Sequence, residues 1–388
     1  MTPREKVLRA WRDASARVDL AGRVAAALAG DDRPIVVVAA GKCARAMLEG
    51  ALRVRGGALI EALAVVPAGS AWAPGDPRVR VLEAAHPLPD ELSVRAAEAA
   101  LALAASASDA NRLFLISGGT SSLLCAPAPG LSLSRKREVV RAMLEADAPI
   151  AEVNVVRRHL SRIKGGGLAR ACGARARRTL IVSDVLEGGP EDVGSGPSVA
   201  DPTSVTDAER VAARLGLGDD LPWIETWKDH ERCDVLADPP LFGELVREGL
   251  AREGFQARTA APARDLSALA DDYAHAADAM RPGEALVRMA EPTLRVDPAA
   301  RGRGGRSSHL AAMMATRIPP RTLFAAIATD GVDGSSGTGG AVVEGPIAGA
   351  EAALERFDTG PLHLAAGTAL PRAPTGLNFA DLHVLVRY

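Results

Sequence analysis

The sequence has 388 residues and a mass of 40.1 kDa, which is enough for about two domains of roughly 100–200 residues each. Hydrophobic residues make up 47% and charged residues 24%, so disorder is excluded as the main state of the chain. A net charge of −2 and an aromatic content of 3% exclude a strongly basic nucleic-acid surface and a base-stacking platform.

Membrane segments and cysteine frameworks are not expected either. No stretch reaches the ~18 uninterrupted apolar residues of a membrane helix, and the first twenty residues lack the apolar segment of a secretory signal. The four cysteines, Cys43, Cys125, Cys172 and Cys233, lie far apart and form no CxxC pair. We therefore expect a reducing, cytoplasmic location, with no membrane and no nucleic acid among the partners.

The first half of the chain alternates apolar runs with helical patterns. Helices are predicted at 4–29, from about 44 to 52, and at 90–107, 132–147 and 150–163, with Ser134 as the N-cap of the fourth. Strands are predicted at 34–40, 59–67, 79–84, 112–117 and 178–185. This alternation predicts an α/β domain with a parallel sheet.

The stretch 216–234 is polar and broken, and we place the domain boundary there, which gives domains at 1–228 and 229–388. Beyond it the patterns predict helices at 241–255 and 309–318. One or two strands are predicted at 284–296, a strand that enters an acidic glycine turn at 321–334, and a final strand at 379–388. The second domain is therefore also expected to be α/β, and smaller than the first.

Two glycine turns follow predicted strands of the first domain. Gly41-Lys42 places one of only five lysines at a strand end, where it is either a surface residue or a cation held against an anionic ligand. The second turn consists of Ser117, Gly118, Gly119, Thr120, Ser121 and Ser122. Glycine lets the backbone approach a ligand, and N–H groups that open a helix favour phosphate. We therefore interpret the second turn as an anion site.

A basic run lies on the helix before a triple glycine. Asn154, Arg157, Arg158 and Ser161 are spaced i, i+3, i+4 and i+7, so they share one face of the predicted helix, and Lys164 follows. The run is either a solvated basic face or part of a binding site. We select Asn154, Arg157 and Lys164 as candidate substrate- or phosphate-binding residues.

Acidic and basic loop residues complete the candidates. Asp330 and Asp333 lie in a glycine turn after a strand, and Asp184 follows a strand of the first domain. Mg²⁺ is typically held by one or two carboxylates together with phosphates and water, so these aspartates are the candidate metal ligands. Arg306 follows Gly304-Gly305 and is suited to bidentate binding of a carboxylate or phosphate.

Several familiar templates are absent. The chain has no GxxxxGK[ST] P-loop, no GxGxxG after a strand and no GxSxG elbow. His86 lies in the rigid turn HPLPDE, where a structural histidine is the simpler interpretation.

Taken in order, the motifs resemble one family over nearly the whole chain. They are AAGKCARAM (39–47), HPLPDE (86–91), LISGGTSSLLCAPAPGLSL (115–133), NVVRRHLSRIKGGGLA (154–169), SDVLEGGPEDVGSGPSVADPT (183–203), GGR (304–306), TDGVDG (329–334) and TGLNFADLHVLV (375–386). The set is similar to glycerate 2-kinases of the MOFRL type, a family also labelled hydroxypyruvate reductase. The chain differs from the family's usual Asn-Gln-Glu after GGR, because Ser307, Ser308 and His309 stand there.

The resemblance implies a Rossmann-like N-terminal domain, a smaller α/β C-terminal domain and an active site in the cleft between them. It implies ATP-dependent phosphorylation of the 2-hydroxyl of D-glycerate with a divalent metal, so ATP and Mg²⁺ are the expected cofactors. By motif match, Lys42 corresponds to the family's active-site lysine and Arg306 to its active-site arginine.

Two alternatives stay open. The chain could be a divergent relative that acts on another hydroxy or sugar acid, or one that binds such a ligand without turnover. Reduction of hydroxypyruvate is disfavoured because the dinucleotide fingerprint is missing. The expected partners are a small hydroxy acid and a nucleotide, and the assembly state, with a homodimer among the options, is open.

Overall fold

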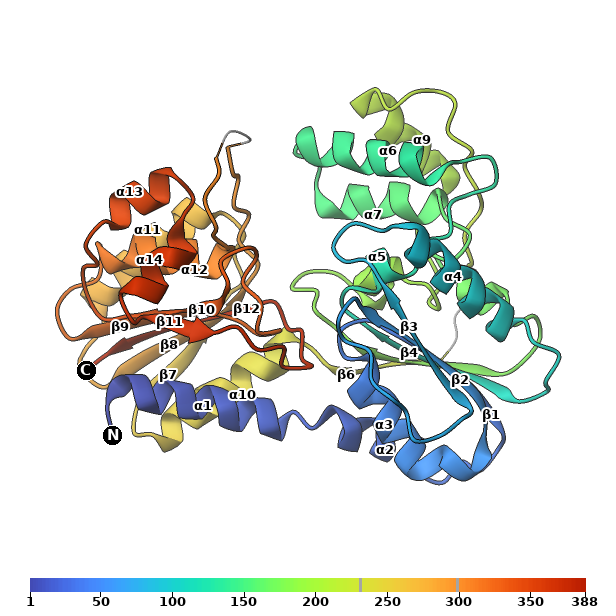
Figure 1. Ribbon diagram of the computed structural model, residues 1–388, viewed down its shortest axis with the longest axis horizontal. Helices are drawn as coiled ribbons and strands as arrows, with labels where there is room; N and C mark the ends of the chain where they lie inside the picture. Colours follow the sequence, from blue (N-terminus) through green and yellow to red (C-terminus); the bar gives the residue numbers. More distant parts are fainter. Residues whose placement is uncertain (230–231, 298–299) are drawn as a thin grey trace. The chain divides into compact units, whose positions relative to one another are not determined.

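The computed structural model describes residues 1–229, 232–297 and 300–388 (Figure 1). The chain divides into two compact units, and each is described by itself. We call Leu20–Ala237 the parallel-sheet unit, and Met1–Asp19 with Asp238–Tyr388 the mixed-sheet unit. Among the helices in these described ranges, none is long and apolar enough to cross a membrane.

The parallel-sheet unit is built on six parallel strands in the order β3-β2-β1-β4-β5-β6. The strands are β1 (Ile35–Ala40), β2 (Leu59–Pro67), β3 (Val79–Ala84), β4 (Asn111–Ser117), β5 (Arg177–Val182) and β6 (Cys233–Ala237). Every residue of β1 is buried, as expected for a strand covered on both faces. The strand order is that of a Rossmann sheet, so the predicted α/β class and Rossmann-like topology are confirmed.

Helices cover both faces of this sheet (Figure 1). The helices are α2 (Leu20–Leu28), α3 (Ala44–Arg55), α4 (Glu91–Ala104), α5 (Thr120–Leu123), α6 (Leu133–Glu145), α7 (Ile150–His159), α8 (Gly167–Arg170) and α9 (Val205–Leu215). Helices α2 and α3 lie on one face, and α4, α5 and α8 on the other. Helices α6, α7 and α9 pack on one another around a separate apolar cluster that includes Met143 and Val156.

Local sequence explains where these helices begin. The Asp90 carboxylate accepts a hydrogen bond from the Ser93 backbone N–H, and the Ser93 hydroxyl accepts one from the Asp90 N–H, so a capping box starts α4. Helix α6 begins after Ser132, whose hydroxyl accepts from the Arg135 N–H. The predicted N-cap Ser134 lies two residues too late, because Ser132 is the residue with extended backbone at the helix start.

The mixed-sheet unit contains a second six-stranded sheet, in the order β11-β10-β9-β12-β8-β7. Its strands are β7 (Gln256–Ala260), β8 (Glu284–Ala290), β9 (Thr322–Ala328), β10 (Thr338–Val343), β11 (Ala369–Pro371) and β12 (Asp381–Arg387). Strands β7 and β8 are parallel and the other neighbours are antiparallel. The predicted strands at 284–296, 321–334 and 379–388 correspond to β8, β9 and β12.

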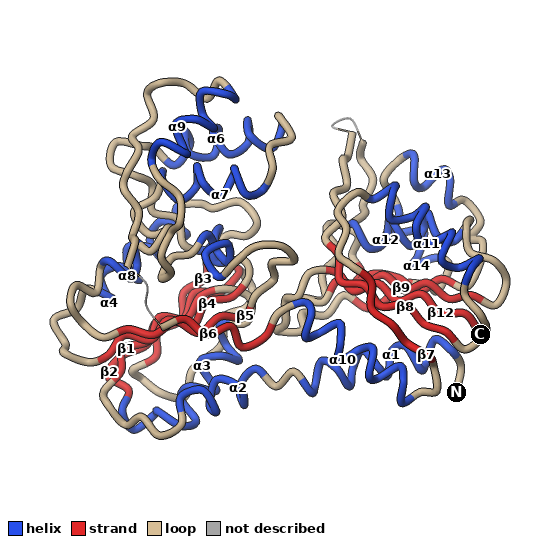
Figure 2. The backbone as a smooth tube through the Cα atoms, turned by 180° about the vertical axis from the view of Figure 1, so that it is seen from behind, coloured by secondary structure: helices blue, strands red, loops and turns tan. Residues whose placement is uncertain are grey.

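The helices of this unit are α1 (Pro3–Arg17), α10 (Pro239–Arg252), α11 (Leu266–Ala279), α12 (Arg306–Ala315), α13 (Ala350–Glu355) and α14 (Thr359–Ala365). Helices α1 and α10 lie on one face of the mixed sheet, and α11, α12, α13 and α14 lie on the other (Figure 2). The core between the sheet and α11 and α12 includes Tyr273, Met314 and Phe324. This packing fixes α12, whose first residue is Arg306.

The division predicted from the sequence, 1–228 and 229–388, differs from these units at both ends. Helix α1 packs on α10, where the Lys6 ammonium donates to the Glu253 carbonyl at 2.7 Å, so the first residues belong to the mixed-sheet unit. Strand β6 pairs with β5 and therefore extends the parallel sheet to Ala237. Sequence pattern cannot show a helix partner more than 200 residues away, and β6 is a short, half-buried edge strand with a weak signal.

Candidate active site

Two predicted glycine turns meet at the centre of the parallel sheet. Gly41-Lys42 follows β1 and Gly118-Gly119 follows β4, and these neighbouring strands are where the strand order reverses. The Lys42 backbone N–H donates to the Gly118 carbonyl at 2.9 Å, which joins the two turns. In open parallel sheets, ligands bind beyond the carboxyl ends of the strands at this switch point.

A close approach at Gly119 brings a third motif into the same place. Gly119 has a φ of +89°, and a Cβ there would lie 3.4 Å from Cγ of Lys42 and 3.3 Å from Cδ2 of His86. The aliphatic stem of Lys42 therefore lies against the turn. The exposed His86, which the sequence analysis set aside as structural, lies on the same turn, and its position in the HPLPDE motif was the available signal.

Two hydroxyls of the second turn face the interior. The buried Ser117 hydroxyl donates to the Ala40 carbonyl at 3.2 Å and accepts from the Cys43 N–H at 3.1 Å. The buried Thr120 hydroxyl donates to the Ser117 carbonyl at 2.7 Å. For these two side chains the geometry favours a role in shaping the turn over the predicted contact with phosphate. Gly118, Gly119 and Ser121 remain the candidates for that contact.

The candidate Lys164 reaches the second turn through its side chain. Its ammonium donates to the Ser121 carbonyl at 2.7 Å and to the Ser121 hydroxyl at 2.9 Å. The Ser121 hydroxyl in turn lies 3.2 Å from the hydroxyl of Ser195, at the end of the 3₁₀ segment η2 (Pro190–Ser195). The structure thus brings together two elements, the turn after β4 and the Lys164 region, that the sequence showed as separate motifs.

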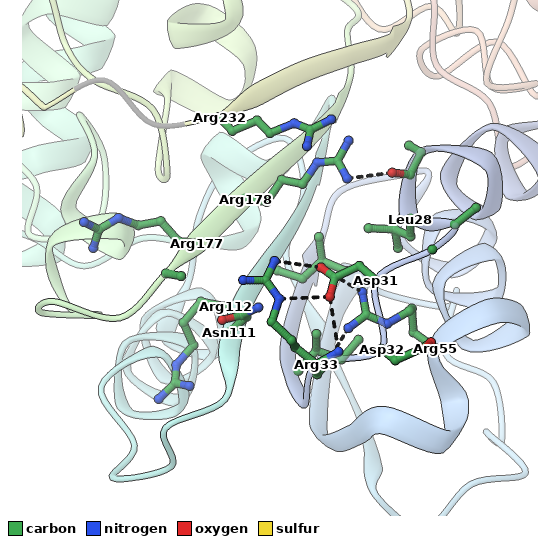
Figure 3. A pocket seen from close by; sticks show the side chains of 16 residues that line it. Leu28, Asp31, Asp32, Arg33, Arg55, Asn111, Arg112, Arg177, Arg178 and Arg232 are labelled. Atoms are coloured by element: carbon green, nitrogen blue, oxygen red, sulfur yellow. Dashed lines mark hydrogen bonds and ion pairs between the residues drawn. The ribbon is translucent and has the colours of Figure 1, made fainter.

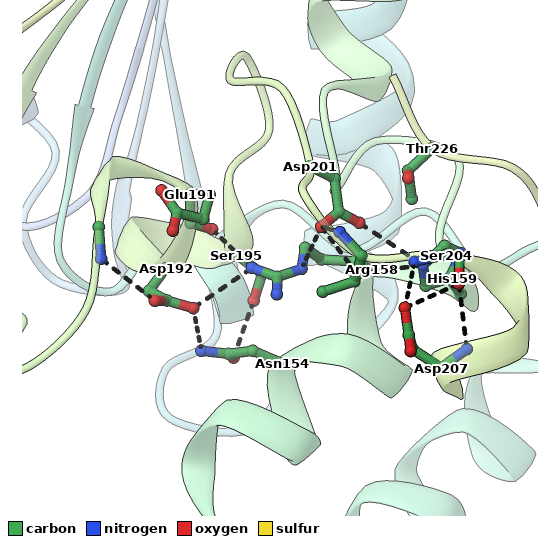
Figure 4. Close-up of polar contacts among 12 residues, drawn as sticks. Asn154, Arg158, His159, Glu191, Asp192, Ser195, Asp201, Ser204, Asp207 and Thr226 are labelled. Atoms are coloured by element: carbon green, nitrogen blue, oxygen red, sulfur yellow. Dashed lines mark hydrogen bonds and ion pairs between the residues drawn. The ribbon is translucent and has the colours of Figure 1, made fainter. Parts of the chain in front are cut away.

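Helix α7 contributes an internal polar network (Figure 4). The Asn154 amide donates to Asp192 Oδ1 at 3.2 Å, and Arg158 Nη1 donates to the same oxygen at 3.2 Å. The buried Asp201 pairs with Arg158 Nε at 3.2 Å and lies 3.6 Å from His159 Nε2. Asn154 and Arg158 therefore hold η2 and the following loop against the helix.

The shared face predicted for the basic run is only partly formed. Helix α7 ends at His159, and the Ser161 hydroxyl donates to the Ala126 carbonyl instead of continuing the face. Arg157 lies on α7 outside the network that contains Asn154 and Arg158. Asp184, the candidate metal ligand of this unit, follows β5 at the same carboxyl edge and is half-buried.

In the mixed-sheet unit, three carboxylates meet at one sheet edge. Strand β12 runs antiparallel between β8 and β9, and Asp381 at its start pairs in register with Ala290 and with Ala328. These are the last residues of β8 and β9, so Glu291 and Asp330 lie just beyond the same edge. The sequence pattern indicates Asp330 but neither Glu291 nor Asp381, because Asp381 has the position of an ordinary strand start.

Arg306 lies among these acids. Its Nη1 is 3.0 Å from Glu291 Oε1, and its Nε is 3.1 Å from Asp381 Oδ2. Burial alone would lower the pKa of Arg306, but the charges of Asp381 and Glu291 outweigh it and raise that pKa. About a third of the Arg306 side chain stays exposed, so the predicted active-site arginine is held by two acids and remains accessible.

Asp381 has an unusual proton affinity for a carboxyl group. Its residue exposure is 4%, and burial raises its pKa to about 7, with Arg306 opposing and the carboxylates of Asp333 and Glu291 adding to the rise. A carboxyl group poised near neutral pH can take up or release a proton during a reaction. This makes Asp381 a candidate that the sequence did not reveal.

Asp333, a predicted metal ligand, is used inside the fold. Its two oxygens accept from the Ser307 N–H at 3.0 Å and the Ser308 N–H at 2.9 Å, at the start of α12. A Cβ on Gly305 would lie 2.1 Å from Asp333 Oδ1, so only glycine allows this approach. The acidic turn therefore fixes the start of the helix that carries Arg306, and the geometry favours this role for Asp333 over metal binding.

The described residues contain no group of three or more His, Cys, Asp or Glu side chains arranged to hold a metal ion. Magnesium commonly takes only one or two carboxylates, with phosphate oxygens and water completing its shell. The half-buried Asp330, on the acidic edge, has the oxygen chemistry that such a site needs. Its predicted role, and that of Asp184, stays a prediction.

A cavity of about 600 Å³ opens at the opposite edge of the parallel sheet, beside the amino ends of β1, β4 and β5 (Figure 3). The cavity is rich in arginine, but guanidinium groups that line it already interact with protein oxygens. Arg33 pairs with Asp31 at 3.0 Å, and the Arg112 side chain donates to four backbone carbonyls. The cavity lies at the wrong ends of the strands for the ligand of a Rossmann sheet.

The structure defines an α/β protein with lysine and glycine turns at the switch point of a Rossmann-ordered sheet in one unit, and an arginine among acids at the edge of a mixed sheet in the other. Two family models match the chain. The model described as a domain of unknown function, DUF4147, covers residues 2–224, and the MOFRL family model covers 284–381. The chain belongs to the MOFRL-type glycerate 2-kinase family, as its motifs indicated.

Individual relatives carry two kinds of name. The chain is 34% identical to a putative hydroxypyruvate reductase of Agrobacterium vitis, over 97% of this chain and 95% of the relative. It is 31% identical to the glycerate 2-kinase of Pyrococcus horikoshii, over 69% and 67%. The crystal structure of the Thermotoga maritima glycerate kinase matches with a TM-score of 0.85, 25% identity and 99% of each chain covered.

Proposed function

We propose that this protein transfers the γ-phosphoryl group of ATP to the 2-hydroxyl of D-glycerate and releases ADP and 2-phosphoglycerate. The main support for this proposal is the contact between the two glycine turns at the switch point. There the Lys42 N–H donates to the Gly118 carbonyl, and the aliphatic part of the Lys42 side chain lies against Gly119. A lysine and a glycine turn, whose backbone no side chain covers, thus lie together at the sheet edge where ligands of this fold bind. Family relatives named as glycerate kinases supply the reaction and the substrate.

The candidate residues have distinct roles in this proposal. Lys42 and Arg306 neutralise negative charge on the substrate carboxylate and on the moving phosphoryl group, which is where phosphoryl-transfer enzymes obtain most of their rate. Gly118, Gly119 and Ser121 cradle phosphate with backbone and hydroxyl donors. Asn154 is a positioning residue, since its amide holds η2 through Asp192 and Ser195.

The chemical step forms a bond from the 2-hydroxyl oxygen to the γ-phosphorus as the bond from that phosphorus to the bridging oxygen of ADP breaks. The hydroxyl proton passes to a carboxylate. Asp381, with its pKa near 7, is the best-suited acceptor among the described carboxylates of the acidic edge. Magnesium, which Asp330 would hold, neutralises phosphate charge when bound.

The alternative of hydroxypyruvate reduction also has an observation in its favour, because the strand order 3-2-1-4-5-6 is common to dinucleotide-binding sheets. However, the turn after β1 carries Gly41, Lys42 and Cys43 in place of a glycine-rich fingerprint. A kinase for another hydroxy acid, or a binder without turnover, differs from our proposal only in substrate or rate.

The position of the transferred phosphate tests the proposal. Purified protein is incubated with ATP, Mg²⁺ and D-glycerate, and the product is identified by ³¹P NMR against authentic 2- and 3-phosphoglycerate. The proposal predicts 2-phosphoglycerate in amounts equal to ADP. Formation of 3-phosphoglycerate, or ADP without a phosphorylated acid, would refute it.

A further inference from the structure

Three buried or partly buried basic side chains lie in neighbouring segments of the parallel-sheet unit, and none of them pairs with a carboxylate among the residues that the structure describes. Lys164 and Lys136 are 3% and 4% exposed, and Arg157 is half-buried on α7. Lysine is almost never fully buried unless it is paired, and this chain places two of its five lysines in one cluster. Lys136 was not among the residues selected from the sequence, where it read as an ordinary residue of a charged helix.

Backbone contacts bring the segments that carry these three residues together. The segment around Ala126 and Pro127 runs antiparallel to the segment around Ser161, with a bridge between Pro127 and Ser161. The Lys136 ammonium donates to the Leu160 carbonyl at 2.6 Å, one turn beyond Arg157. Lys164 follows three residues after Ser161 and donates to Ser121.

Among the described residues, no carboxylate offsets the positive charges of Lys136, Arg157 and Lys164. Burial lowers the pKa of Lys136 to about 8, and burial together with repulsion from Lys136 and Arg157 lowers the pKa of Lys164 well below its usual value. Burial also lowers the pKa of Arg157. Within the described chain the opposing group in each case is the Cys125 thiol, and no carboxylate contributes.

Arg157 is the open side of the cluster. Among the described residues it makes no hydrogen bond or ion pair, whereas the neighbouring Arg158 is paired with Asp192 and Asp201. A guanidinium group offers five donors in a planar fork that matches phosphate. Each of the two lysines donates hydrogen bonds to protein oxygens, and among the described residues neither pairs with a carboxylate.

We propose that Lys136, Arg157 and Lys164 form a binding subsite for the phosphate group of a reaction component, contiguous through Ser121 with the turn after β4. A phosphate carries a charge of about −1.5 to −2, which compensates three mutually repelling cations better than a single carboxylate does. The proposal rests on the proposed function, because that function supplies two sources of phosphate, the nucleotide and the phosphorylated acid.

The competing explanation is structural. Lys136 caps the carbonyl end of α7 through Leu160, and cations are favourable at helix C-termini. The two explanations predict opposite changes in the thermal midpoint of unfolding for the variant Lys136→Met. If the lysine is a cap, its removal lowers the thermal midpoint and leaves phosphate binding unchanged. If the cluster is an anion site, its removal relieves repulsion and raises the midpoint in phosphate-free buffer.

The experiment titrates inorganic phosphate into the full chain by calorimetry, with no turnover involved. We expect Arg157→Met and Lys136→Met to weaken phosphate binding by about 10- to 100-fold, the effect of a lost charge-assisted hydrogen bond. The matched control is Arg162→Met. Arg162 lies close to Arg157 in the sequence but is exposed and paired with Glu98, so its removal should leave the phosphate affinity unchanged. Phosphate should raise the thermal midpoint of the wild type and of the control, but not that of Lys136→Met.

Competition then identifies the source of the phosphate. Displacement of inorganic phosphate by ADP assigns the subsite to the nucleotide, and displacement by 2-phosphoglycerate assigns it to the phosphorylated acid, so either result supports it. Equal affinities across all variants, no binding to the wild type, or displacement by neither ligand would overturn it. Phosphate binding with these variant effects but no glycerate-dependent ADP would refute the proposed function and leave the subsite standing.

Discussion

The two units place opposite charges at the edges of their sheets. In the parallel-sheet unit, Lys42 and Lys164 gather beside glycine turns, whereas in the mixed-sheet unit Glu291, Asp330 and Asp381 surround one arginine. The topologies explain how each set forms. Parallel strands bring successive strand ends to one edge, but in the mixed sheet the start of β12 lies between the ends of β8 and β9.

The two units also differ in the partners of their basic side chains. Arg306 is held by two acids and stays a third exposed, so its position is defined before any ligand binds. Within the described ranges, the Lys164 ammonium donates to the neutral oxygens of Ser121 and pairs with no carboxylate. Arg306 on the acidic edge is therefore paired within the protein, whereas Lys164 on the cationic edge has no carboxylate partner among the described residues.

The largest expected effect is on the cationic edge. Lys42→Met should reduce glycerate-dependent ADP release by about 10²–10³-fold, because a cation that stabilises the moving phosphoryl group is lost. The matched control, Arg45→Gln, removes an exposed cation three residues further along, at the start of α3. Turnover of Lys42→Met within about twofold of the control would remove Lys42 from the reaction.

Arg306 tests whether the two units serve one reaction. Arg306→Met should lower turnover by about 10²-fold, again by loss of charge stabilisation. Groups that act on one transition state are not additive, so the double variant with Lys42→Met should lose much less than the product of the single losses. A double variant whose loss equals that product would show that the two cations act independently.

Asp381 predicts a pH dependence of stability in the mixed-sheet unit. A carboxyl with its pKa raised to about 7 by burial contributes stability that is complete below about pH 4 and is lost as pH rises to about 7. Asp381→Asn cannot ionise. Its free energy of unfolding relative to wild type should therefore rise across this window, by up to about 4 kcal/mol, and then stay constant.

Denaturant titrations of both proteins between pH 4 and pH 9 measure this difference. Arg306, Glu291, Asp330 and Asp333 are present in both, so their own ionisation largely cancels. A difference that does not change with pH would mean that Asp381 is ionised throughout the range.

The smallest expected effect concerns the start of α12. Gly305→Ala puts a Cβ 2.1 Å from Asp333 Oδ1, so the turn must move, and we expect a loss of about 1–3 kcal/mol in unfolding free energy. Gly345→Ala is the control, because a Cβ there meets no atom within 4 Å. Equal stability of the two variants, measured by chemical denaturation, would show that Asp333 does not fix the helix.

Sequence pattern predicted the parallel sheet well, because β1, β4 and β5 contain apolar runs that are buried in the sheet and leave a strong signal. Strands β2 and β3 have the bounds predicted from the sequence. The pattern missed what depends on partners remote in the chain. Helix α1 packs on α10, and the edge strand β6 pairs with β5, although neither contact has a local signature.

The candidate site shows the same limit. Glycine turns after strands indicated Lys42 and the second turn as candidates, because the residues that form each pattern are consecutive in the sequence. The ligand roles predicted for Ser117, Thr120 and Asp333 stay predictions, although the hydrogen bonds of their side chains to the backbone, which the sequence does not show, favour a structural role. Asp381 and Lys136 were missed because what distinguishes them is burial beside other charges, which only the fold creates.

The central claim is the phosphoryl transfer itself, and one paired assay tests it most directly. ADP release from ATP and Mg²⁺ is measured with and without D-glycerate, and NADH loss is followed with hydroxypyruvate under the same conditions. Our account predicts ADP release that depends on glycerate and no loss of NADH. Loss of NADH without glycerate-dependent ADP would contradict it and assign the chain to the reductases.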